Sequence, residues 1–213
     1  MNANPQTRNP NLRLLFAIAA CAGLTGCFGF LKPAHPTARN FVLTPLPVEA
    51  SVTASPGALA VGVGQVKLPA YLFNTSLAVR IGANEINYLP SALWAERLDN
   101  GFQRVLAANL AASLSTDRIR LSTWHREDVA TEVYVTIEQF DVSASGRGVL
   151  VARWRTVAPG GENTLKAGES RLTHQGPVPD TDPSGAVATL SQLVADFSRQ
   201  VAQAIGDAAP PVR

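Results

Sequence analysis

Two segments of the chain repeat apolar residues every three to four positions, which is the spacing of an amphipathic helix. The first spans residues 92–115 and follows Pro90-Ser91, while the second starts at Asp182-Pro183 and stops at Gly206. Aspartate caps helix starts and proline is tolerated in a first turn, which supports the second start. The apolar stripes are Trp94, Leu98, Phe102, Val105, Leu106, Leu110 and Leu114, then Val187, Leu190, Leu193, Val194, Phe197, Val201 and Ile205. Each predicted helix therefore has one face to bury.

Shorter runs of alternating apolar and polar residues predict strands. Residues 132–143, 148–158 and 164–174 form a three-stranded meander, with a turn near Gly146. The remaining predicted strands are 41–43, 59–68, 76–81, 85–89 and 118–122, of which 76–81 and 85–89 form a hairpin around Gly82-Ala83-Asn84. One sheet with both helices on one face would bury both stripes. We therefore predict a single α+β domain over residues 41–207, with a mixed, mostly antiparallel sheet and a loose tail at 208–213.

The first 26 residues have the pattern of an export signal. A polar start precedes an apolar run at 14–23, which is shorter than the roughly 20 residues that a membrane span needs. The run leads into Leu24-Thr25-Gly26-Cys27. This resembles the lipobox of bacterial lipoproteins, which implies that the leader is cut before Cys27 and that the cysteine carries fatty-acyl chains. The alternative is an ordinary secretory peptide that contains a cysteine.

A lipidated Cys27 would attach the domain to a membrane through a short tether. Residues 27–40 are the lipidated cysteine and its tether. The thirteen residues 28–40 contain two prolines and little periodicity, and they span at most ~45 Å extended and ~20 Å as a coil. Lipoproteins with aspartate after the cysteine tend to stay at the inner membrane, and here that position is Phe28. The resemblance therefore implies the outer membrane, with the domain facing the periplasm.

Charge and chemistry exclude several function classes. The chain has 18 basic and 16 acidic residues, and the leader holds two of the basic ones, Arg8 and Arg13. The remainder is neutral, which offers no electrostatic footprint for nucleic acid. The three histidines, His35, His125 and His174, are not spaced as metal ligands. We expect no metal, no cofactor and no enzyme, since no nucleophile elbow or phosphate-binding glycine loop is present either.

Several stretches in a fixed order resemble the ABC-type transport auxiliary lipoproteins. These stretches are Val61 to Leu72, Arg80 with Asn84-Glu85-Ile86, Trp94 to Leu98, Arg104 to Leu110, Phe140-Asp141 and Arg153-Trp154. The resemblance covers roughly residues 41–205, with one departure at Arg97, where the family favours proline. It implies an accessory subunit of a lipid-trafficking system between two membranes, without catalysis. Such systems contain a periplasmic protein of the mammalian-cell-entry (MCE) class, which forms rings or tubes, and an inner-membrane permease.

The expected role is an outer-membrane dock for the MCE protein, in a homo-oligomer that matches its ring. Pro69, Tyr71, Leu72 and Phe73 are candidate contacts, although Tyr71 and Leu72 would equally suit packing over the sheet edge. The second candidate is Arg153 with Arg155, whose alternative is an ordinary exposed face.

Two other functions stay open at this point. The first is a periplasmic carrier that holds an acyl chain between its sheet and its helices. The second is a periplasmic hydrolase, which the three scattered histidines disfavour.

Overall fold

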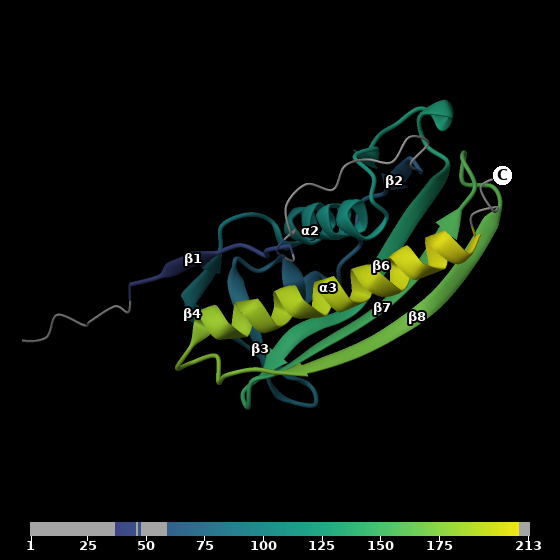
Figure 1. Ribbon diagram of the computed structural model, residues 1–213. Helices are drawn as coiled ribbons and strands as arrows, with labels where there is room; N and C mark the ends of the chain where they lie inside the picture. The colour runs from purple at the N-terminus through teal and green to yellow at the C-terminus, as the bar shows by residue number, and fades with distance from the viewer. Residues whose placement is uncertain (1–36, 46, 48–58, 209–213) are drawn as a thin grey trace, which may run out of the picture. The chain divides into compact units, whose positions relative to one another are not determined.

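The computed structural model describes residues 37–45, 47 and 59–208 (Figure 1). The predicted signal peptide, Cys27, most of the tether and the tail lie outside these residues. In chain order the elements are β1 (Arg39–Phe41), β2 (Val61–Val63), η1 (Ala70–Phe73), β3 (Ser76–Gly82), β4 (Glu85–Trp94), α2 (Leu98–Ser113), β5 (Ile119–Leu121), η2 (Arg126–Asp128), β6 (Thr131–Ser143), β7 (Arg147–Val157), β8 (Thr164–Gln175) and α3 (Pro183–Ala208).

The strands form one eight-stranded sheet in which β6 is central. The predicted meander is confirmed, since β6, β7 and β8 pair in antiparallel order, and β3 and β4 form the predicted hairpin. The other side of β6 pairs in parallel with β2 near its start and with β3 near its end. The pairings of β1 with β4 and of β2 with β5 are also parallel. Four of the seven pairings are therefore parallel, and the prediction of a mostly antiparallel sheet is wrong.

Local sequence explains this error. A hairpin leaves a turn signal between two adjacent runs, as at Gly82-Ala83-Asn84 and at Gly146, whose φ of +85° suits glycine. A parallel pair joins segments that are far apart in the chain and has no turn to announce it. The partners Val61 and Thr131, for example, lie seventy positions apart.

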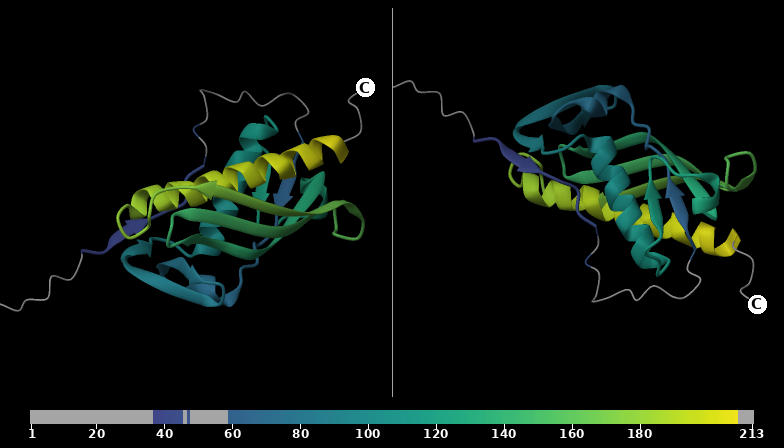
Figure 2. Two further views of the ribbon diagram at one scale, coloured as in Figure 1. Left: turned by 90° about the horizontal axis from the view of Figure 1, so that it is seen from below. Right: turned by 90° about the horizontal axis from the view of Figure 1, so that it is seen from above.

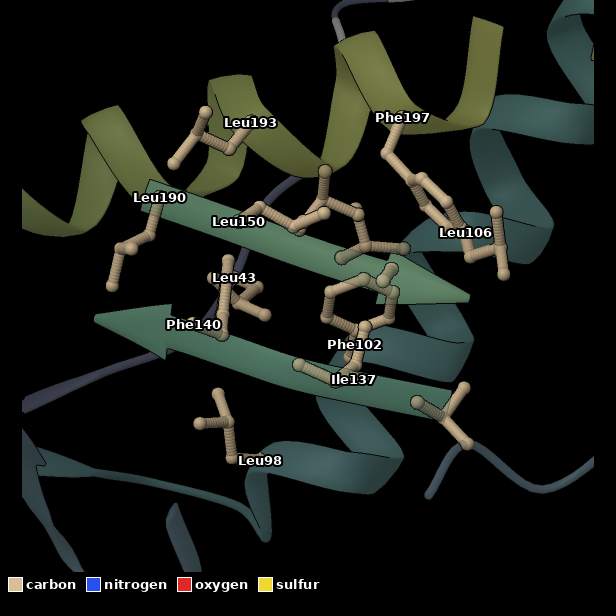
Figure 3. Packing of buried hydrophobic residues seen from close by; sticks show 14 of the residues in the cluster. Leu43, Leu98, Phe102, Leu106, Ile137, Phe140, Leu150, Leu190, Leu193 and Phe197 are labelled. Carbon is tan, nitrogen blue, oxygen red and sulfur yellow. The ribbon is translucent and has the colours of Figure 1, made fainter. Parts of the chain in front are cut away.

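Both helices place their apolar stripes against the sheet, which confirms the α+β prediction with two helices (Figure 2). Phe102 of α2 meets Phe140 of β6 edge-on, with ring centroids 5.3 Å apart, and meets Phe197 of α3 at 6.0 Å. All three rings are at most 1% exposed (Figure 3). The layer between helices and sheet is therefore closed by interlocking aromatic side chains at this point.

The first helix starts later than predicted. Strand β4 continues through Pro90 and Ser91 to Trp94, and α2 begins only at Leu98. Proline is tolerated in this strand because it lies at a register shift between Ser76 and Leu77 on the β3 side and before the first β1 partner, Ala92. Trp94 therefore belongs to a strand and not to the helix stripe.

Other boundaries also differ from prediction, among them β1, which covers 39–41 and not 41–43. Strand β2 ends at Val63, because the chain then leaves the ladder and returns only for a single bridge between Lys67 and Thr136. Helix α3 continues through Gly206 to Ala208, since one glycine costs a helix only about 1 kcal/mol. Among the described helices, none is both long enough and apolar enough to cross a membrane.

Candidate functional site

Two buried carboxylates hold irregular segments of the chain against strand β6. Asp141 is 1% exposed and Glu132 is 4% exposed. A buried carboxylate is costly unless hydrogen bonds compensate it, and both carboxylates have several such partners.

Asp141 fixes the short helix η1, which contains three of the predicted contact residues and directly follows the fourth, Pro69. The Tyr71 hydroxyl donates to Asp141 Oδ2 at 2.9 Å, and Arg80 Nη2 donates to the same oxygen at 2.7 Å. Gln139 donates to Oδ1 at 3.0 Å, and the Tyr88 hydroxyl donates to the Tyr71 carbonyl at 3.0 Å. Burial, and next the charge of Asp141, raise the pKa of Tyr71 to about 12. The hydroxyl therefore stays protonated and keeps donating.

The hydrogen bond between Tyr71 and Asp141, which we call the Tyr71–Asp141 clamp, determines which residues of η1 reach solvent. Leu72 is 3% exposed and packs into the core, so its side chain is not available to an exposed contact surface. Pro69 and Tyr71 are half-buried, and the Tyr71 hydroxyl is already engaged. Phe73 is 52% exposed. Of the four predicted candidates, Phe73 alone presents most of its side chain to solvent.

Phe73 lines a hollow of about 350 Å³, which we call the Phe73 hollow. Its lining residues are Leu72, Phe73, Asn74, Thr75, Trp94, Ala95, Glu96, Arg97 and Leu98. The Arg97 guanidinium lies 5.3 Å from the Phe73 ring centroid and forms an ion pair with Asp99 at 2.7 Å. Trp94 and Arg97 are not among the predicted contacts, because both fall within the helix predicted at 92–115. The hollow combines an apolar wall with a cation at its rim.

The second set of predicted contact residues, Arg153 and Arg155, lies on one face of strand β7. Arg153 forms an ion pair with Glu138 at 2.5 Å, and the Arg155 guanidinium lies 5.1 Å from the Tyr134 ring centroid. Both arginines line a shallow groove of about 450 Å³, which we call the arginine groove. Its lining residues are Tyr134, Thr136, Arg153, Trp154, Arg155, Ala167, Gly168 and Glu169. It shares no lining residue with the Phe73 hollow, so the structure keeps the two predicted sets apart.

Glu132 fixes the segment that precedes strand β6. Its Oε1 accepts from the Trp124 indole at 3.1 Å and from the Gly160 amide at 3.0 Å, while Oε2 accepts from Tyr134 at 2.8 Å. Burial raises the pKa of Glu132, but these three hydrogen bonds outweigh it and hold the pKa below its ordinary value. The carboxylate therefore stays charged.

The same rings explain the glycines of Val61-Gly62-Val63-Gly64. A Cβ at Gly62 would lie 2.6 Å from the Trp124 ring, and one at Gly64 would lie 2.7 Å from the Tyr134 ring. Both distances are shorter than atoms tolerate, so glycine is required for the rings to pack on the chain. The glycines accommodate aromatic side chains here.

The described titratable residues do not gather into a metal-binding group. Within residues 37–45, 47 and 59–208, no three His, Cys, Asp or Glu side chains are placed to hold an ion. His174 Nε2 lies 2.5 Å from Asp196, while His125 is exposed before η2. His35 lies outside the described residues.

Two solved structures have this fold. A crystal structure of an uncharacterized protein matches with a TM-score of 0.66 and 20% identity, and covers 79% of this chain and 99% of that one. Protein XCC0632 from Xanthomonas campestris matches with a TM-score of 0.60 and 11% identity, over 81% of this chain and 95% of that one. A PelC dodecamer from Paraburkholderia phytofirmans has a TM-score of 0.44 at 12% identity, over 70% and 92% of the two chains. No curated protein matches.

The sequence itself matches a described family. The match is to the ABC-type transport auxiliary lipoprotein component and covers residues 41–202, which is nearly the whole described domain. The stretches quoted above for the resemblance all lie within it. This chain therefore belongs to the ABC-type transport auxiliary lipoprotein family, which implies a lipid-anchored accessory of a transport system with a non-catalytic role.

Proposed function

We propose that this lipoprotein is held in the outer membrane by an acylated Cys27, faces the periplasm, and docks the MCE-domain component of a lipid transport system. The inner-membrane permease of the same system would complete the route between the membranes. The lipobox and Phe28 support the anchor and its address, and the family supports the transport role. Because the tether reaches at most ~45 Å, the domain acts as a receptor for a partner that comes to it.

Phe73 is the observation that carries the docking role. When a partner covers a large apolar side chain that is half exposed, the side chain leaves water, and this favours binding. The Tyr71–Asp141 clamp holds its helix in place before binding, so little conformational entropy is lost on contact. Arg97 at 5.3 Å adds a cation beside the ring, and aromatic and arginine side chains are typical of binding hot spots.

A carrier function is less well supported. It requires space for an acyl chain between the sheet and the helices. Phe102, Phe140 and Phe197 fill the centre of that layer with at most 1% exposure. A dock needs no such space.

We further propose a homo-oligomer that matches a ring-shaped partner, and a role in envelope integrity.

The docking proposal is tested by pull-down of the full-length, acylated protein from detergent-solubilised envelopes. We expect it to retain the MCE component above a control lipoprotein. Phe73→Ser should lower that yield about tenfold or more, as expected for a hot spot. Ile81→Ser is the matched control, because Ile81 is 48% exposed and does not line the Phe73 hollow. Equal yields for the wild type and the control lipoprotein would refute docking.

The anchor is tested separately with Cys27→Ser. The variant should leave the outer-membrane fraction, since the fatty-acyl chains provide its attachment. It should also fail to restore envelope integrity in cells that lack the protein. A variant that still sediments with the outer membrane and restores integrity would refute the anchor.

A further inference from the structure

Strand β8 is a long and unpaired edge of the sheet. It has twelve residues, and among the described residues it pairs with β7 alone (Figure 1). The other outer strands, β1 and β5, have three residues each. An edge strand presents a row of free N–H and C=O groups to any extended chain that comes alongside. The length of β8 makes it the main site for such pairing in the described domain.

Side chains on one face of β8 are already committed to helix α3. Lys166 pairs with Asp207 at 2.9 Å, and the Ser170 hydroxyl donates to Gln200 at 2.7 Å. These contacts hold the strand against α3. They also neutralise Lys166, and a free lysine on an edge strand would discourage pairing with another chain. The opposite face of β8 carries the residues that border the arginine groove.

Only a small side chain lies between the arginine groove and this edge of the sheet. Arg155 stands opposite Ala167 in the β7–β8 register, so only a methyl group separates the guanidinium from the edge on that row. A side chain of a strand added beyond β8 could therefore reach across Ala167 to Arg155.

The groove favours an acidic side chain. Arg153 is compensated by Glu138 at 2.5 Å and stands opposite Glu169 in the register. Arg155 contacts the Tyr134 ring, and among the described residues no carboxylate forms an ion pair with it. An exposed guanidinium beside an aromatic ring is well placed to bind a carboxylate in two-pronged fashion.

We propose that the β8 edge and the arginine groove together bind an extended, acidic segment of a partner protein, which adds to the sheet as a further strand. This rests on the proposed docking function and names the chemistry of one contact. The edge provides main-chain hydrogen bonds, and Arg155 selects a Glu or Asp residue in the added strand. A second copy of this chain fits less well, because its β8 carries one acidic side chain, Glu169, beside the basic Arg171 on the same face.

The test places a photo-crosslinker, p-benzoylphenylalanine, at position 173 of the full-length acylated protein in cells. Thr173 is exposed on β8 and does not line the groove, so the path across Ala167 stays open. We expect a crosslink to a partner segment that mass spectrometry identifies as acidic. Arg155→Glu should lower the crosslink yield about tenfold or more, because the reversed charge repels the segment. Arg147→Glu is the matched control, since it makes the same change on the same strand outside the groove, and it should keep the yield.

Folding and alternative occupants are controlled in the same experiment. Thermal melting of each variant checks folding, and a crosslinker at Leu165, which is 46% exposed, provides a second position on the edge. A crosslink to a second copy, to lipid, to a segment without acidic residues or to nothing overturns the inference, as does equal loss in both arginine variants. Retention of the MCE component without a crosslink overturns this inference alone. An acidic crosslinked segment from an unrelated protein supports the site and overturns the proposed docking function.

Discussion

The two faces of strand β6 are stabilised in different ways. On the helix side, Phe102, Phe140 and Phe197 contact each other as apolar rings, and helices α2 and α3 are fixed by the area that they bury. On the other side, Asp141 and Glu132 are buried charges surrounded by hydroxyl, indole, guanidinium and amide donors. Apolar contact has no preferred direction, whereas a hydrogen bond has one.

This difference matches what each face holds in place. A long helix buries enough apolar surface to be positioned by packing alone. The short helix η1 buries a single leucine, Leu72, and therefore buries too little apolar surface to be positioned by packing alone. Its position depends on Tyr71 and Asp141, and so does the exposure of Phe73. The candidate contact residue therefore lies on the face where direction, and not buried area, decides the structure.

The largest expected effect is on the apolar face. Phe102→Ala removes a fully buried ring that touches both a strand and the other helix, and should lower the free energy of unfolding by about 3–5 kcal/mol. Urea unfolding measures this value. Phe102→Leu should cost clearly less, because packing tolerates a change that keeps most of the volume. Equal losses for both substitutions would show that the ring geometry, and not volume, stabilises this face.

Removing the buried charge should have the next largest effect. Asp141→Ala leaves Arg80 and Tyr71 without their acceptor, which should cost about 2–3 kcal/mol. Asp141→Asn keeps the shape and should cost less, although it loses the charge. Limited proteolysis should show cleavage near η1 in the alanine variant before the rest of the domain unfolds. Cleavage only on global unfolding would contradict the view that Asp141 fixes η1 locally.

The smallest expected effect concerns Tyr71 and depends on pH. Tyr71→Phe loses the hydrogen bond to Asp141 and a longer one, 3.4 Å, from the Phe140 amide, and should cost about 1 kcal/mol at neutral pH. The folded chain holds the Tyr71 proton up to about 12, whereas the unfolded chain releases it near 10.0. Stability from this group is therefore present below 10.0 and is lost as pH rises toward 12.

The difference between wild type and Tyr71→Phe should accordingly shrink across that interval. Urea midpoints at neutral pH and within the interval measure it, and other tyrosines cancel because both proteins contain them. A difference that stays constant with pH would mean that the Tyr71 hydroxyl is not held by Asp141.

The sequence indicated many of the residues of the candidate site, but not which of their side chains are exposed or which residues lie next to each other. The run Pro69 to Phe73 was singled out from its sequence, yet nothing local distinguishes the buried Leu72 from the exposed Phe73. That distinction depends on Asp141, which lies seventy positions after Tyr71 in the chain. The role of Arg155 likewise depends on Ala167, which is adjacent only through the β7–β8 register.

The amino-acid sequence by itself determined the α+β class, the two helices, the hairpins and the meander, because each has a periodic pattern and a local turn or cap. Only the tertiary structure decided the parallel pairings, the strand path through Pro90 and the separation of the Phe73 hollow from the arginine groove. The physical reason is distance along the chain. Local patterns encode which face of a segment is apolar, whereas the choice of neighbour depends on contacts between segments that share no sequence signal.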